Sequence, residues 1–207
     1  MEDFDRMITY KGCSTTAREI IQSNRKSAFS DMRSYNTTFE LDDNCDSDNS
    51  KLARNYAGTF FKGCRGLLFY GGCGSGKTFL AACITNAIID RGFTAIFTSI
   101  SSIERKLWSA KDKDSVFDEL IKYDLIVLDD FSAERKSDYM SSICYDVIDW
   151  IYRSKKSVII TTNLSPTEFN TADISQQRLY SRLLEMALPV KVTGDDRRKT
   201  WLKENME

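Results

Sequence analysis

The sequence predicts an α/β fold in which a mostly parallel five-stranded sheet is flanked by helices. From residue 65 onward, short apolar runs typical of strands alternate with longer runs that have helical spacing. Such alternation favours βαβ units, which place strands in parallel and helices on both faces of the sheet. The first apolar run also leads into a glycine-rich segment, residues 71–78, and then into an alanine-rich helix. This order is typical of a strand, a phosphate-binding loop and a helix.

The first 64 residues lack this regular alternation. Residues 15–32 have weak helical periodicity with interleaved basic residues. Residues 36–50 contain five carboxylates and no Lys or Arg, a composition typical of a polar connector. Residues 51–62 again have helical spacing, with Leu52, Tyr56 and Phe60 on one side. We expect a short helical extension and an acidic connector before the regular part of the chain.

The remaining elements follow in order. Residues 124–129 illustrate the strands, because their interior is continuously apolar, as in a strand buried on both faces. The expected strands are residues 65–70, 94–99, 124–129, 157–162 and 188–192. The expected helices are residues 78–90, 103–108, 116–123, 138–153, 174–186 and 195–207.

Composition excludes several kinds of chemistry. The length of 207 residues suits one domain with an appendage, and a net charge of -1 excludes a strongly basic protein that coats nucleic acid, although not a local basic face. The chain has no histidine, which excludes Ser-His-Asp catalysis, HExxH zinc sites and histidine-ligated haem. Its six cysteines form no CxxC pair, and no apolar stretch approaches about 18 residues. We therefore expect a cytoplasmic protein with reduced thiols and no membrane span.

Residues 71–78 match the phosphate-loop pattern GxxxxGK[ST] in full. Glycines allow a tight turn that points several N–H groups at one anion, and the following helix directs its positive end at the same point. Lys77 is expected to contact the β- and γ-phosphates of ATP, and the Thr78 hydroxyl to ligate Mg²⁺. The alternative is a glycine-rich turn that binds nothing. The predicted nucleotide-binding residues are Gly71, Gly72, Cys73, Gly74, Ser75, Gly76, Lys77, Thr78 and Phe79.

Polar residues follow two later strands. Asp129 and Asp130 end the strand at 124–129, and the carboxyl end of that strand should lie beside the phosphate loop. Asp129 is then a ligand for Mg²⁺, directly or through water, and Asp130 orients or polarises the attacking water. Asn163, after the strand at 157–162, could position water near the γ-phosphate. The alternatives are a solvated acidic turn for the two aspartates and a strand-ending turn residue for Asn163.

Four segments resemble the AAA+ ATPases of the DnaC, DnaI and IstB type, which are replicative helicase loaders and related transposition helper ATPases. The resemblance covers residues 50–200 in order. The segments that carry it are GLLFYGGCGSGKTFLAACI (66–84), LIVLDDFSAERKSDY (125–139), VIITTNLSPTEF (158–169) and RLYSRLLEM (178–186).

The resemblance implies an AAA+ P-loop NTPase with a C-terminal lid reduced to one helix. It divides the chain into residues 1–50, an extension and connector that could dock a partner, and residues 51–207, the ATPase domain. Asn163 becomes the sensor 1 residue. Arg182 becomes a candidate arginine finger that acts on the γ-phosphate of a neighbouring subunit, and self-association then completes the site.

The resemblance also implies roles at the nucleotide site for three further arginines. Arg178, one helical turn before Arg182, is a second candidate for the arginine finger. Arg197 and Arg198 match the sensor 2 region, and which of them faces the nucleotide stays open. The alternative for each finger candidate is a surface ion pair.

The helical insert after the second strand faces single-stranded DNA in the resembling family. Here the insert reads IERKLWSAKDK from residue 103 to residue 113. Arg105, Lys106 and Trp108 are therefore candidates for DNA contact, with bases stacking on the indole. The alternative is that Trp108 anchors this helix to the core.

The leading functional hypothesis is an ATPase that delivers a DnaB-type replicative helicase to single-stranded DNA. An IstB-like transposition helper is the first alternative, and a small P-loop kinase or a non-hydrolysing nucleotide-binding module are the others. The sequences Thr-Thr-Asn at 161–163 and Ser-Arg-Leu at 181–183 argue against the kinase. Asp130 stands where many family members have Glu, which suggests slow turnover.

Overall fold

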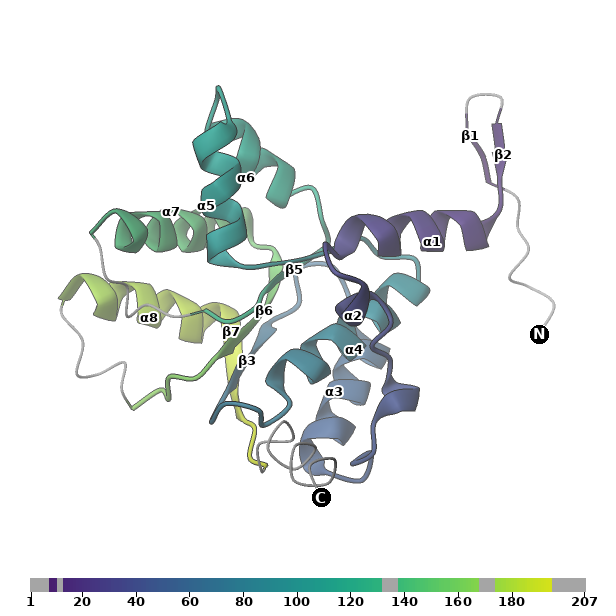
Figure 1. The fold of residues 1–207 in the computed structure, drawn as a ribbon, viewed down its shortest axis with the longest axis horizontal. Helices are drawn as coiled ribbons and strands as arrows, with labels where there is room; N and C mark the ends of the chain where they lie inside the picture. Colours follow the sequence, from purple (N-terminus) through teal and green to yellow (C-terminus); the bar gives the residue numbers. More distant parts are fainter. Residues whose placement is uncertain (1–7, 11–12, 132–137, 168–173, 195–207) are drawn as a thin grey trace, which may run out of the picture.

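The sheet at the centre of the computed structural model has five strands that all pair in parallel, in the order β4-β5-β6-β3-β7 (Figure 1). The structure describes residues 8–10, 13–131, 138–167 and 174–194, and the mostly parallel five-stranded sheet expected from the sequence is confirmed. The strands are β3 (Gly66–Tyr70), β4 (Ala95–Thr98), β5 (Leu125–Leu128), β6 (Ser157–Thr162) and β7 (Ala187–Lys191).

Helices cover both faces of this sheet (Figure 1). One face packs against α1 (Ala17–Ala28), α3 (Asp48–Thr59) and α4 (Lys77–Asp90). The other packs against α5 (Ile100–Ser109), α6 (Asp114–Leu120), α7 (Asp138–Ser154) and α8 (Ile174–Met186).

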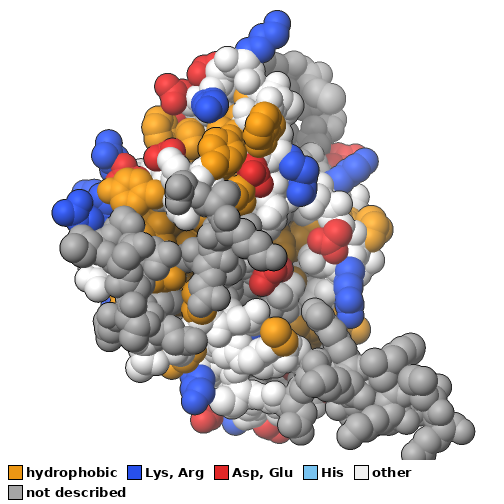
Figure 2. All heavy atoms as spheres, turned by 60° about the vertical axis from the view of Figure 1, so that its left-hand side comes forward, with side chains coloured by type: hydrophobic (Ala, Val, Ile, Leu, Met, Phe, Trp, Pro, Cys, Tyr) orange, Lys and Arg blue, Asp and Glu red, His pale blue; other side chains and the backbone are white. Residues whose placement is uncertain are grey.

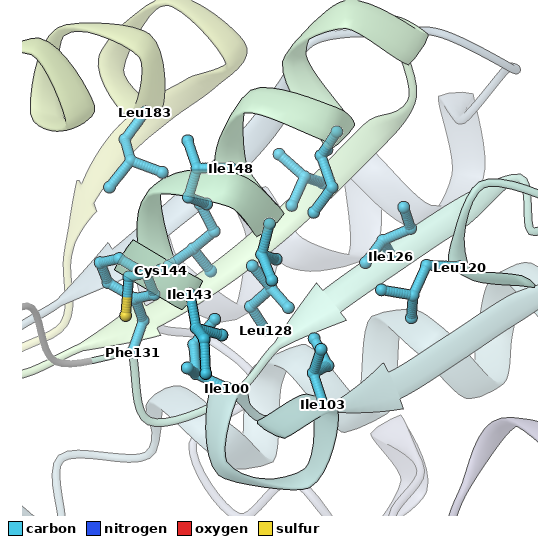
Figure 3. Close-up of a cluster of buried hydrophobic side chains, with 14 of the residues drawn as sticks. Ile100, Ile103, Leu120, Ile126, Leu128, Phe131, Ile143, Cys144, Ile148 and Leu183 are labelled. Carbon is cyan, nitrogen blue, oxygen red and sulfur yellow. The ribbon is translucent and has the colours of Figure 1, made fainter. Parts of the chain in front are cut away.

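Strand β5 supplies side chains to both cores. Leu125 and Val127 belong to the cluster under α4, whereas Ile126 and Leu128 belong to the cluster under α5 and α7. Successive side chains of a strand point to opposite faces, and all four are fully buried, which explains the unbroken apolar run. Figure 3 shows the second cluster, in which Ile126 and Leu128 lie among side chains of α5, α7 and α8.

Helix α4 is surrounded on most sides. It contacts α3 and α2 (Met32–Tyr35) as well as strands of the sheet. Its residues from Leu80 to Asn86 are all buried. Small side chains such as Ala81 and Ala82 allow this close approach from several directions, and this accounts for the alanine-rich sequence.

The segment before β3 packs on the sheet and on α4, beginning within α1. Ala28 and Phe29 are buried, Phe29 forms a parallel bridge with Phe97 of β4, and their ring centroids are 5.3 Å apart. A 3-10 turn, η1 (Phe39–Leu41), follows α2. Before α1, β1 (Ile8–Tyr10) and β2 (Cys13–Thr15) form an antiparallel pair that the sequence analysis did not predict. The division of the chain at residue 50 stays a prediction.

Several helix boundaries differ from those expected. Helix α1 ends at Ala28 instead of continuing to residue 32, because Phe29 is extended and bridges to β4. Helix α3 begins at Asp48, three residues before the expected start, because the Ser47 side chain accepts a hydrogen bond from the backbone of Ser50. The helix expected at residues 195–207 lies outside the described residues.

None of the helices in the described part of the chain is both long and apolar enough to cross a membrane.

Candidate nucleotide-binding site

The phosphate loop lies between β3 and α4, where the sequence predicts it. Gly71 has φ +144, and a Cβ atom there would stand 2.2 Å from the carbonyl oxygen of Val192, so only glycine fits. Gly76 is left-handed, with φ +101, directly before the first turn of α4. The Lys77 side chain is buried, and its Nζ donates to the carbonyls of Gly71 at 2.9 Å and Gly72 at 2.7 Å. The ammonium group thus closes the loop on itself.

Asp129 lies beside the start of α4. Its Oδ1 accepts hydrogen bonds from Thr78 Oγ1 at 2.9 Å and from Thr161 Oγ1 at 2.6 Å. Hydroxyl and carboxylate oxygens are the ligands that Mg²⁺ prefers, so Thr78 and Asp129 can hold this ion together with phosphate oxygens. The structure therefore brings together two residues that are 51 positions apart and that sequence analysis assigned to the metal.

Thr161 is a residue of this corner that sequence analysis missed. Leu128 of β5 pairs with Ile160 of β6, so the following residues, Asp129 and Thr161, come level at the sheet edge. The register between β5 and β6 would have identified Thr161 as a neighbour of Asp129, but this register cannot be derived from the sequence alone.

The chain turns sharply at Asp130. This exposed residue has φ 53, a left-handed conformation that Asp tolerates better than most residues. Its backbone N donates to Thr161 Oγ1 at 2.9 Å, and Phe131 N donates to the Thr161 carbonyl at 2.7 Å. These two bonds fix the Asp130 backbone next to Asp129 and leave the carboxylate of Asp130 in solvent.

Asn163 directly follows β6 and is exposed. Thr162 pairs with Tyr70, the last residue of β3 before the phosphate loop, so Asn163 reaches the same sheet edge as the loop. Its assignment as sensor 1 stays a prediction.

Two hollows adjoin the phosphate loop, and both are partly lined by residues 33–49. The first, of about 320 Å³, lies between α2 and the start of α4. The second is bordered by Asp42, Asn44, Ser47 and Asn49 on one side, by Ser75 and Phe79 of the loop region, and by Val192 and Thr193 after β7. The acidic connector expected from the sequence is therefore a wall of the site.

The Ser75 hydroxyl fits a site for a polar ligand. Its oxygen is buried in the loop and has no hydrogen-bond partner among the described residues. Buried hydroxyls in proteins are nearly always hydrogen-bonded, and a bound nucleotide would supply the partner.

Arg182 lies on α8 and is held by groups of its own chain. Its Nη1 is 2.6 Å from Asp149 Oδ1 on α7, an ion pair whose atoms are not aligned as a hydrogen bond. The guanidinium also lies over the rings of Tyr145 and Tyr152, at 4.9 and 5.6 Å from their centroids. Arg178, in contrast, is exposed. Arg197 and Arg198 lie outside the described residues.

Trp108 is exposed on α5, with 73% of its surface accessible. The alternative in which it anchors the helix to the core is therefore wrong, because Ile100, Ile103 and Leu107 fill that role. The indole meets the ring of Tyr139 edge to face, with centroids 5.9 Å apart. On the side of the molecule shown in Figure 2, exposed hydrophobic side chains lie among basic and acidic ones.

The two basic candidates near Trp108 differ in their partners. Lys106 forms an ion pair with Glu119 at 3.3 Å, and Arg105 donates to the hydroxyl of Ser102 at 2.8 Å. Both side chains are exposed. Arg105 keeps its charge uncompensated by a carboxylate among the described residues.

Comparison with known proteins gives one family and several relatives. Residues 2–204 match the family described as IstB-like ATP binding protein. An insertion sequence ATP-binding protein of Sinorhizobium fredii is 35% identical over 107 residues, which are 50% of this chain and 36% of that protein. The replicative helicase loader DnaI of Bacillus subtilis is 27% identical over 156 residues, which are 65% of this chain and 48% of that protein. The matched part of this chain thus spans less than half of each relative.

A solved structure extends the comparison to the fold. The crystal structure of the DnaC helicase loader matches with a TM-score of 0.68 at 25% identity, over 79% of this chain and 100% of that chain. This likeness confirms the AAA+ P-loop fold that the sequence motifs indicated. Because the family match covers nearly the whole chain and the phosphate loop has the geometry described above, the chain belongs to the family of IstB-like ATP-binding proteins.

Proposed function

We propose that this protein hydrolyses ATP and delivers a DnaB-type replicative helicase to single-stranded DNA. One observation carries the proposal that the protein hydrolyses ATP. The Asp129 carboxylate accepts hydrogen bonds from Thr78 of the phosphate loop and from Thr161. The relation to DnaI and DnaC, which are named as replicative helicase loaders, supports the loading role.

Each residue of the site has a part in hydrolysis. Lys77 binds the β- and γ-phosphates, and Thr78 and Asp129 would hold Mg²⁺, which when bound would supply positive charge next to the transferring phosphoryl group. Asp130 orients the attacking water, and Asn163 holds a position near the γ-phosphate. The Asp130 carboxylate is one methylene shorter than Glu, so we expect slow turnover, which suits a switch.

Arg182 of a neighbouring subunit completes the site in this proposal. An arginine finger stabilises negative charge in the transition state and is worth ~10³ to 10⁵ in rate. In the single chain, Arg182 forms an ion pair with Asp149 and lies over two tyrosine rings. In this proposal Arg182 therefore does not act on the nucleotide of its own subunit. Hydrolysis then depends on assembly.

Single-stranded DNA is the second expected ligand. Trp108 offers an exposed ring for base stacking, and Arg105 lies on the same helix for phosphate contact. We place the protein in the cytoplasm, where replication takes place.

Co-purification tests this proposal. The full chain, loaded with ATP, is mixed with the replicative helicase of its source and separated by size, with the Lys77→Ala variant as the control that lacks nucleotide. We expect a complex with the helicase that depends on ATP, and ATP hydrolysis that single-stranded DNA increases. If no complex with the helicase forms, the proposed loading role is wrong.

A transposition helper is the second candidate, favoured by the family match and by the Sinorhizobium fredii relative. In that case the mixture with the helicase gives no complex, and the same separation after mixing with a transposase of its source gives a complex that depends on ATP. Phosphorylation of a small acceptor would instead support the kinase, and a wild-type protein without turnover would support a non-hydrolysing module.

A further inference from the structure

The N-terminal segment brings a basic side chain to the phosphate loop. The hollow of about 320 Å³ beside α4 is lined on one side by Arg33, Ser34 and Thr37. The remainder of its lining comes from the loop and the start of α4, namely Gly74, Gly76, Lys77, Thr78, Phe79 and Ala82. Arg33 therefore faces the same space as the residues that bind phosphate.

Residues on one face of α4 border this hollow and hold the segments on either side of it. Thr78, Ala82 and Asn86 are spaced by four residues and so share one face of the helix. Thr78 contacts Asp129 at the metal corner, Asn86 binds the N-terminal segment, and the small side chain of Ala82 between them leaves the hollow open.

The backbone around Arg33 is fixed to the same helix. The buried Asn86 Nδ2 donates to the carbonyls of Ser34 at 3.1 Å and Thr37 at 2.7 Å. Asp31 accepts from Ser34 N at 2.8 Å, and the Thr37 hydroxyl donates to the Arg33 carbonyl at 2.8 Å. Arg33 thus stands at a set position relative to the phosphate loop.

The charge of Arg33 is not compensated by the protein. Two other arginines of the segment before β3 form ion pairs, Arg25 with Asp90 and Arg54 with Asp42. Arg33 is exposed, and the ion pairs among the described residues do not include it. A cation without a carboxylate partner, in a hollow that also contains Lys77, fits an anionic ligand, and guanidinium groups bind phosphate through paired hydrogen bonds.

We propose that Arg33 binds the phosphate tail of the nucleotide held by the loop. The N-terminal segment is then a part of the ATP site. This inference rests on the assignment of residues 71–78 as the ATP-binding loop.

Nucleotide titration tests the inference on the full chain. Affinity for ATP, ADP and AMP is measured by competition with a fluorescent ATP analogue, for the wild type and for Arg33→Ala, Arg33→Lys and Lys26→Ala. The last is a matched control, because Lys26 is an exposed cation of the same segment that does not line the hollow. Thermal unfolding checks that each variant folds, which we expect because Arg33 is exposed.

We expect Arg33→Ala to bind ATP about tenfold more weakly, Arg33→Lys to recover part of the affinity, and Lys26→Ala to match the wild type. The loss should be larger for ATP than for AMP. Equal ATP affinity for Arg33→Ala and Lys26→Ala, or an equal loss for all three nucleotides, would overturn the inference. A wild type that binds no ATP would instead overturn the assignment of the loop.

Discussion

At the scale of single residues, the most informative contact is the one in which two hydroxyls donate to the same oxygen of Asp129. The loop motif identifies Thr78, and the acidic strand end identifies Asp129. Thr161 could not be assigned, because its role depends on the alignment of β5 with β6. Arg33 was missed for a similar reason, since nothing in the sequence shows that α2 lies against α4.

Replacing Thr161 by Val tests the importance of this contact. The substitution keeps the shape of the side chain but removes the donor to Asp129 and the acceptor of the Asp130 backbone. We expect kcat for ATP hydrolysis to fall by roughly tenfold or more, because small misplacements of catalytic groups are costly, while ATP affinity changes little.

Thr162→Val is the matched control for that measurement. Thr162 is equally buried in β6, but its hydroxyl accepts from Leu164 N and does not contact Asp129. Steady-state hydrolysis and nucleotide titration separate the two effects. If both variants lose the same amount of kcat, the contact with Asp129 has no special role.

At the scale of elements, strands were predicted more closely than helix ends. The β6 run matches the expected boundaries, since buried apolar residues define it. Helix α1 stops four residues early because Phe29 joins the core with Phe97, a contact between distant parts of the chain. Helix ends governed by such tertiary contacts are not visible in local periodicity.

Asp124 connects the segments that precede β3, β4 and β5, at the opposite end of the sheet from the phosphate loop. Its carboxylate accepts from the backbone and hydroxyl of Thr94 at 3.0 and 3.1 Å, and Lys62 Nζ lies 2.9 Å away. Burial alone raises the pKa of Asp124, but the Thr94 hydrogen bonds and the Lys62 ammonium outweigh it and leave the pKa below its ordinary value.

Because the pKa of Asp124 is lowered, we expect its contribution to the free energy of unfolding to depend on pH. A carboxyl whose folded pKa is lowered stabilises the fold above its unfolded pKa, about 3.9, and this contribution disappears as the pH falls through the folded pKa. We expect Asp124→Asn to lower the free energy of unfolding by about 1–3 kcal/mol at pH 7 and much less in strong acid. The Lys62 side chain is 70% exposed, so most of the loss comes from the Thr94 bonds.

Urea unfolding at several pH values provides the measurement. Asp46→Asn is the control, because Asp46 forms an ion pair with Lys51 at 3.8 Å but is 96% exposed. It should leave stability nearly unchanged. A deficit for Asp124→Asn that stays constant down to strong acid would contradict the assigned pKa shift.

At the scale of the whole molecule, the proposed function places the nucleotide and the arginine finger that acts on it in different subunits. The phosphate loop lies at the carboxyl ends of β3 and β6, whereas Arg182 is bound on α8 by Asp149 of α7. A contact in which one surface of a subunit meets a different surface of the next is heterologous and can repeat into a ring or a filament.

Mixing two defective variants tests this arrangement. Lys77→Ala keeps Arg182 but cannot bind phosphate correctly, and Arg182→Ala keeps the phosphate loop but has no finger. We expect each alone to be nearly inactive and an equal mixture to recover roughly a quarter of wild-type hydrolysis, from interfaces that join one intact loop to one intact finger. Thermal unfolding of both variants serves as the folding control. A mixture as inactive as its components, or an Arg182→Ala variant with full activity, would contradict action in trans.

The packing of residues 28–37 also decides where the chain can be shortened. A deletion that starts the protein at residue 51 would uncover Phe97 of β4 and remove two of the three carbonyls that accept from the Asn86 amide, those of Ser34 and Thr37. Uncovered apolar surface promotes aggregation, and the loss of these two hydrogen bonds costs stability. An expression fragment intended to keep the nucleotide-binding site intact should therefore begin before α1.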